Sequence, residues 1–194
     1  GLTDSVIRLS SKIGAHDTIA LDYWMTVGKL HEEAHDLNRH VIRKTPEYLV
    51  RTTKDYWKAW VSKNNHDFKD LGSSAQSLYY QSLRMCRVHA DDSGGIIASS
   101  DTDLLKYGRD AYSYVWPRDA ALISIAMTKA GYLDVSKRFF DFCLKAIMPD
   151  GFFMHKYRAD ASIGSSWHPW VQDGVNILPI QIDETALVII AIAK

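Results

Sequence analysis

Residues 112–119 read Tyr-Ser-Tyr-Val-Trp-Pro-Arg-Asp, and an apolar stretch typical of a buried helix begins directly after them. Aromatic faces stack on sugar rings, and a fixed Arg-Asp pair can bracket sugar hydroxyls with charge-assisted hydrogen bonds. Two later segments, 150–157 and 165–184, are similarly rich in aromatic, His and carboxylate groups. Together the three segments predict a carbohydrate site.

The spacing of apolar residues predicts a mainly α-helical fold. Helical patterns occupy the following segments: 45–61, 74–89, 118–130, 134–147 and 183–193. Thr45-Pro46 is a favourable N-cap and first helical position for the first of them. A polar stretch, 62–69, separates it from the second and is typical of a linker.

The predicted helices differ in how their apolar residues are distributed. Residues 120–130 and 185–193 are apolar almost all round, as buried helices are, whereas 74–89 and 134–147 keep a polar face. Buried and half-exposed helices that alternate along a chain indicate two concentric layers. Arg118-Asp119 and Asp183-Glu184 both stand at the starts of the buried helices, so the two motifs should meet if those helices run parallel.

The N-terminal part has a different pattern. Residues 18–27 alternate between apolar and polar positions, which predicts a strand of an antiparallel sheet, and residues 6–13 suggest a second one less clearly. Two strands alone do not make a stable sheet, so we expect their partners to precede residue 1. The last predicted helix reaches Lys194 without a stop signal, and we therefore expect the chain to be truncated at both ends.

Composition narrows the functional classes. The 194 residues are 46% hydrophobic, enough for a substantial core, and 23 basic residues balance 23 acidic ones. A net charge of zero gives no electrostatic reason to expect nucleic acid or an anionic membrane as partner. There is no apolar run of the roughly 20 residues that span a bilayer and no signal peptide, so we expect a cytoplasmic protein. Cys86 and Cys143 fall in helical patterns and are expected to be thiols.

Each feature of the predicted sugar site has a simpler structural explanation when it is taken alone. The aromatic residues of 112–116 can be core, and Arg118-Asp119 can be an ion pair at a helix start. His155 can be an ordinary hydrogen-bonded histidine, and Asp183 and Glu184 can be first-turn acids. The combination of all these features is what favours a sugar site.

The combination also resembles a known family. Gly94-Gly-Ile-Ile-Ala-Ser99, followed by the pattern Tyr112-x-Tyr-x-Trp-x-Arg-Asp119, is similar to the glucoamylase-like glycoside hydrolases of family fifteen. The prokaryotic and archaeal branch, which includes glucoamylases and trehalases, is matched by three further motifs: Asp150-Gly-Phe-Phe-Met-His-Lys-Tyr157, Gly164-Ser-Ser-Trp-His-Pro-Trp170 and Leu178-Pro-Ile-Gln-Ile-Asp-Glu-Thr-Ala-Leu187.

The resemblance implies a fold and a domain organisation. It implies the first part of an (α/α)6 barrel at residues 70–194, preceded by a helical linker at 29–69 and by the end of a β-sandwich domain at 1–28. It implies no cofactor and no metal.

The resemblance also implies a glucose pocket. Arg118 and Asp119 would hold hydroxyls of the terminal glucose, and Tyr112 and Trp116 would line the pocket of the ring. The same pocket would be shaped by Trp167, His168, Gln181 and Asp183.

The family hydrolyses terminal α-glucosidic bonds with inversion, using a general acid and a general base. The family's acid lies in a Trp-Glu-Glu type segment that residues 1–194 do not contain, so we expect both catalytic carboxylates to lie outside this sequence and the chain alone to be inactive. Starch-type oligosaccharides are the expected substrates, trehalose is the alternative within the family, and a fragment that binds sugar without cleaving it is the non-enzymatic alternative. The oligomeric state stays open.

A second chemistry is carried by His31-Glu-Glu-Ala-His35, which matches the zinc-binding pattern H-E-x-x-H. On a helix this spacing places both His on one face, with Glu32 as a general base. A zinc metallopeptidase is therefore a minor alternative. Such a site needs a third ligand, for which Glu47 and Asp55 are available downstream.

Overall fold

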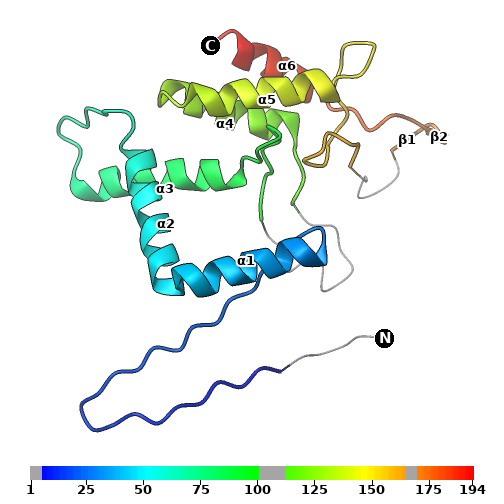
Figure 1. The fold of residues 1–194 in the computed structure, drawn as a ribbon. Helices are drawn as coiled ribbons and strands as arrows, with labels where there is room; N and C mark the ends of the chain where they lie inside the picture. Colours follow the sequence, from blue (N-terminus) through cyan, green and yellow to red (C-terminus); the bar gives the residue numbers. More distant parts are fainter. Residues whose placement is uncertain (1–5, 101–111, 165–169) are drawn as a thin grey trace. The chain divides into compact units, whose positions relative to one another are not determined.

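The computed structural model describes residues 6–100, 112–164 and 170–194, and it is mainly helical. The chain forms two compact units, Gly1–Ala59 and Trp60–Lys194, which are considered separately. The elements of the described residues are α1 (His31–Lys44), α2 (Pro46–Val61), α3 (Ser73–His89), α4 (Pro117–Lys129), α5 (Leu133–Ala146), β1 (Val171–Gln172), β2 (Val175–Asn176) and α6 (Ile182–Ile192) (Figure 1).

In the first unit the strand predicted over residues 18–27 is not formed, and neither is the weaker one over 6–13. Both segments are extended and are joined by a turn in which the Asp17 N–H donates to the Gly14 carbonyl, but they make no ladder (Figure 1). Their large apolar side chains are exposed, as Met25 is at 77%. The alternation supplies an apolar face, whereas a strand also requires a hydrogen-bonded neighbour, and no described residue provides one.

Two helices, α1 and α2, follow the extended segments of the first unit. α1 ends at Lys44, because the φ of 69° at the next residue, Thr45, breaks the helical path, and Pro46 then begins α2 as the sequence predicts. Glu32 and Glu33 lie in the first turn of α1 and Arg43 and Lys44 in its last turn, which complements the helix dipole. No residue of α1 is buried.

The core of the second unit lies between α4, α5 and α6 (Figure 1). α4 and α5 form a helical hairpin that turns at Gly131, where φ is +81°. Tyr132, fully buried after this turn, stacks on Trp60 with ring centroids 4.3 Å apart and donates its hydroxyl hydrogen to the backbone carbonyls of Trp60 and Val61. The remaining core includes Phe139 and Phe142 of α5 and, from the segment between α5 and β1, Phe153 and Tyr157.

Four predicted helices are found in the second unit, but the burial of α6 differs from the expectation. α6 buries only Glu184, Val188 and Ala191, and the apolar Ile189 is 62% exposed. Within the described residues α6 packs mainly against α4, so only one of its faces is covered. α5 keeps the polar face that the sequence predicts: six of its residues are buried, and charged residues such as Lys137 and Asp141 stay exposed. None of the described helices is long and apolar enough to span a bilayer.

Both cysteines are free thiols, as expected. Cys143 is buried and Cys86 is half buried. Burial raises the pKa of the Cys143 thiol to about 12.

Candidate functional site

Arg118 joins the starts of α4 and α6. Its Nη1 atom donates to Gln181 Oε1 at 2.8 Å and to Asp183 Oδ2 at 3.1 Å, and its Nη2 atom donates to Asp119 Oδ2 at 3.2 Å. The structure therefore brings together four of the residues that the sequence assigns to the site. It also confirms that the two helix-start motifs meet at one end of a parallel helix pair (Figure 1).

Glu184 contacts Arg118 in the candidate site, although sequence reasoning did not select it. Its side chain is completely buried, its Oε2 atom accepts the backbone N–H of Arg118 at 2.5 Å, and its Oε1 atom lies 3.3 Å from Arg118 Nη1. A signal for this burial exists in the sequence, because Glu184 shares a helix face with Val188 and Ala191, four and seven residues later. An acid on the buried face of an apolar helix requires a partner.

Burial and charge set the protonation behaviour of this pair. Burial raises the pKa of Glu184 to about 7, aided by the charges of Asp119 and Asp183, while the Arg118 N–H and guanidinium act in the opposite direction. For Arg118, burial disfavours the charged form, but the carboxylates of Glu184, Asp183 and Asp119 outweigh it and raise the pKa. The guanidinium therefore stays charged.

The aromatic residues before α4 pack around Trp116. The Trp116 indole is 4% exposed, and its Nε1 atom donates to His155 Nε2 at 3.2 Å. The Tyr112 ring is tilted against the indole at 5.7 Å, and the Tyr114 ring meets it edge-on at 6.2 Å. Tyr112, at 44% exposure, is the more accessible of the two predicted wall residues.

The segment that carries His155 lies alongside the residues before α4. Val115 and Tyr157 exchange two backbone hydrogen bonds of 2.8 and 2.9 Å. This pairing places the buried Lys156 with its ammonium 4.2 Å from the Tyr114 ring centroid and 5.5 Å from that of Trp116. Lysine is rarely buried, so its position was not predictable from its residue type.

The approach of Lys156 to Tyr114 depends on Gly164. The Gly164 N–H donates to the Lys156 carbonyl at 2.9 Å, and a Cβ atom at this position would lie 2.9 Å from Tyr114 Cδ1. Trp167 and His168 follow shortly after and lie outside the described residues. Trp170, at the end of the same motif, has its ring 5.5 Å from that of His155.

The zinc pattern lies on α1, in the first unit. The rings of His31 and His35 stack with centroids 6.4 Å apart, so they share a helix face as the spacing predicts. Asp36 is engaged in an ion pair with Arg39. Across residues 6–100, 112–164 and 170–194, no group of three or more His, Cys, Asp or Glu residues could hold a metal ion. The third ligand that this hypothesis requires is therefore not placed beside the motif.

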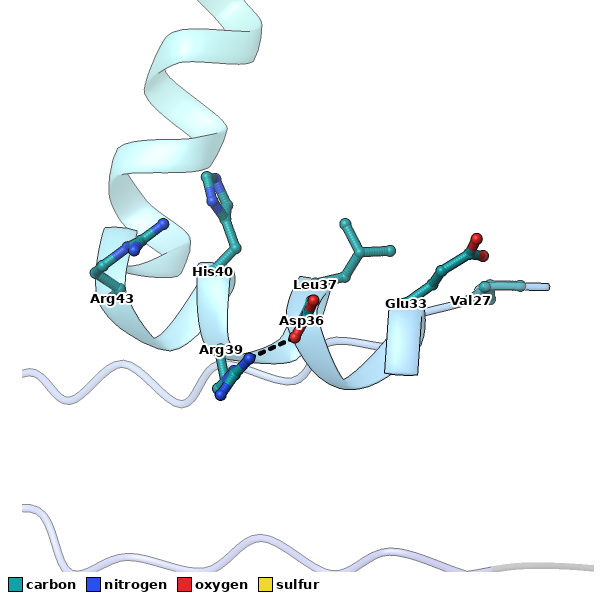
Figure 2. Close-up of a pocket in the computed structure, with 8 residues that line it drawn as sticks. Val27, Glu33, Asp36, Leu37, Arg39, His40 and Arg43 are labelled. Atoms are coloured by element: carbon teal, nitrogen blue, oxygen red, sulfur yellow. Dashed lines mark hydrogen bonds and ion pairs between the residues drawn. The ribbon is translucent and has the colours of Figure 1, made fainter. Parts of the chain in front are cut away.

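An open hollow lies beside the same helix. Its lining includes Val27 and the α1 side chains of Leu37, His40 and Arg43 (Figure 2). The hollow is broad and exposed and holds none of the residues assigned to the sugar site.

A part of the second unit is similar to a known protein family. Residues 73–165, which include Arg118, Asp119 and His155, match the family model described as glycosyl hydrolases family 15. This match confirms the resemblance to family 15 glycoside hydrolases that the motifs predict.

One curated relative is similar to a larger part of the chain. An uncharacterized glycosyl hydrolase of Methanocaldococcus jannaschii is 26% identical over 161 residues, which are 80% of this chain and 25% of the relative. The chain thus spans a quarter of the length of that relative. No solved structure matches the chain significantly.

Proposed function

We propose that this chain carries the glucose-binding part of an inverting, exo-acting glycoside hydrolase that cleaves terminal α-glucosidic bonds of starch-type oligosaccharides. The observation that carries the proposal is the cluster around Arg118. One guanidinium contacts the carboxylates of Asp119 and Asp183, which are 45% and 52% exposed, and Arg118 follows the aromatic residue Trp116 by two positions in the chain. The family 15 resemblance of the same segment supports it.

The proposed roles follow from this geometry. A carboxylate has about four lone-pair sites, so Asp119 and Asp183 can each accept sugar hydroxyls in addition to the Arg118 hydrogen bond. For the same sugar hydroxyls, the Arg118 guanidinium supplies hydrogen-bond donors, and the Gln181 side-chain amide supplies both a donor and an acceptor. Charged hydrogen bonds of this kind discriminate the orientation of hydroxyl groups.

The aromatic side chains would form the wall of the pocket. Tyr112 offers an accessible ring, and Trp116 stands behind it in an orientation fixed by His155. We extend the proposed pocket to Trp167 and His168 on the strength of the motif that contains them. The proposed architecture is an (α/α)6 barrel from residue 70, with a β-sandwich end at 1–28 and a helical linker at 29–69.

The general acid and base are not assigned to residues of this chain. An inverting pair of carboxylates stands roughly 6.5–9.5 Å apart with a water molecule between them. Glu184 is fully buried against Arg118, and Asp183 is paired with the same guanidinium, so neither is placed to protonate a leaving group.

The test is glucose release by the intact protein from maltotriose and from trehalose, at equal concentrations. Release from maltotriose supports the proposal. Release from trehalose alone would show that trehalose, and not starch-type oligosaccharides, is the substrate, and it would still support the proposed glucose pocket. Binding of D-glucose by calorimetry without release from either sugar would favour a binding protein and contradict hydrolysis.

A further inference from the structure

We propose that Glu184 is a positioning residue of the sugar site, which fixes both the backbone and the guanidinium of Arg118 without touching the sugar. The inference rests on the proposed function in one respect, namely that Arg118 is a sugar ligand. The contact between the two residues is a property of the fold itself.

Glu184 cannot act as a ligand. Its side chain has no exposed surface, whereas the Arg118 side chain is 30% exposed. Both carboxylate oxygens face Arg118, one at the backbone nitrogen and the other at Nη1. Any effect of Glu184 on a sugar must therefore pass through Arg118.

The start of α4 explains why an acid from another helix is needed. Trp116, the N-cap residue, makes no side-chain capping bond, and Pro117 at the first helical position has no N–H. Arg118 therefore has the first backbone N–H of the helix, and this partly buried N–H group requires an acceptor. Glu184 supplies this acceptor from α6, and the ionised form of Glu184 also suits the positive end of the α4 dipole.

The other partners of Arg118 differ from Glu184 in accessibility. Asp119 and Asp183 reach the guanidinium from the solvent side, where water or sugar hydroxyls can exchange with them. Glu184 holds the inner side, where no such exchange is possible. The guanidinium therefore has one fixed anchor and an outer side that can adapt to a ligand.

Removing Glu184 should have different effects if it is only a structural helix cap and if it is a positioning residue. A cap lowers stability when it is removed, but its effect on sugar turnover is independent of the Arg118 side chain. A positioning residue acts through that side chain, so its effect disappears when the side chain is absent.

The first experiment measures Arg118 directly and needs no substrate. Phenylglyoxal modifies accessible guanidinium groups, and peptide mapping by mass spectrometry reports the rate at Arg118 in the intact protein. We expect Glu184→Ala to raise this rate several-fold, and Glu184→Gln, whose amide oxygen still accepts the Arg118 N–H, to raise it less. The control is Asp134→Asn, because Asp134 is a first-turn acid of α5 that pairs with Arg138 and should not affect Arg118. An unchanged rate in both Glu184 variants overturns the inference.

The second experiment is a double-mutant cycle on kcat/KM for maltotriose. Glu184→Ala should lower kcat/KM about tenfold in the wild-type background and have no further effect in Arg118→Ala. If Glu184→Ala does not fold, Glu184→Gln completes the same cycle with a smaller effect. Equal losses in both backgrounds would overturn the inference. Faster labelling of Arg118 in a protein that neither cleaves nor binds glucose-containing sugars would overturn the proposed function and leave the positioning of Arg118 supported.

Discussion

Glu184 and Arg118 are 66 residues apart in the chain and are joined by a hydrogen bond from the Arg118 backbone N–H to Glu184 Oε2. The bond fixes the first turn of α4 against the first turn of α6. Asp119 and Asp183 lie in these two turns and Gln181 is the N-cap of α6, so the bond also assembles the polar cluster of the candidate site.

Loss of the Arg118 side chain should impair turnover. If Arg118 holds glucose hydroxyls in the transition state, Arg118→Ala in the intact protein should cost about 2–4 kcal/mol of transition-state stabilisation, measured as kcat/KM for maltotriose. The control is Arg138→Ala, an arginine of α5 whose ion pairs with Asp134 and Asp92 are exposed. Equal kinetics in wild type and Arg118→Ala would refute the assigned role.

The titration of Glu184 should appear in the pH dependence of stability. Burial raises the pKa of Glu184 from 4.5 to about 7. The ionisable groups that face the Glu184 carboxyl are Arg118, Asp119, Asp183 and Tyr157. Between these pH values the folded protein keeps a proton that the unfolded chain releases. The contribution of Glu184 to the free energy of unfolding is therefore largest below about pH 4.5. It falls as the pH rises to about 7 and is constant above that pH.

Glu184→Gln removes this titration while keeping the shape of the side chain. Urea unfolding of both proteins is measured between pH 5 and 8. As the pH rises, the free energy of unfolding of the wild type should fall relative to that of Glu184→Gln, by at most about 1.4 kcal/mol per pH unit. Parallel curves over this range would show that Glu184 keeps an ordinary pKa.

The hydrogen bond between Trp116 and His155 should contribute measurably to stability. Trp116→Phe keeps an aromatic ring but removes the N–H that donates to His155 Nε2, which should lower the free energy of unfolding by about 1–2 kcal/mol. Trp24→Phe is the control, because the Trp24 indole donates to Asn38 at an exposed site. Denaturant titrations compare the two variants, and equal losses would mean that burial adds nothing to the Trp116 bond.

Gly94 allows the loop after α3 to pack closely against α5. Its φ is +100°, and a Cβ atom there would lie 1.9 Å from the Arg138 carbonyl oxygen. Gly94→Ala should therefore destabilise the protein by about 3 kcal/mol or more. Gly72→Ala should cost less than about 1 kcal/mol, because Gly72 is the N-cap of α3 and has nothing within 4 Å of its added Cβ. Similar melting temperatures for the two variants would contradict this account of the loop.

The sequence predicts the helices of the second unit well because their ends carry local signals. Residues 118–130 were expected to be helical and α4 spans Pro117–Lys129, where Pro117 sets the start. Pro46 sets the start of α2 in the same way. Helical spacing and proline act within a few residues, so they can be recognised without knowledge of the fold.

Features that depend on distant partners were not predictable to the same extent. The alternation at residues 18–27 predicts a strand, but strand formation depends on a neighbour that the pattern does not specify. The burial of Glu184 and Lys156 depends on Arg118 and on Tyr114, which lie far from them in the chain. The motifs predict Arg118, Asp119, Gln181 and Asp183 as site residues, whereas only the structure shows that the Arg118 guanidinium contacts the other three.

The most direct test of the proposed function is the anomeric form of the glucose that the intact protein first releases from maltotriose, followed by proton NMR before mutarotation. Inverting cleavage of a terminal α-glucosidic bond predicts β-glucose as the initial product. Initial release of α-glucose, or no release of glucose, would contradict the account.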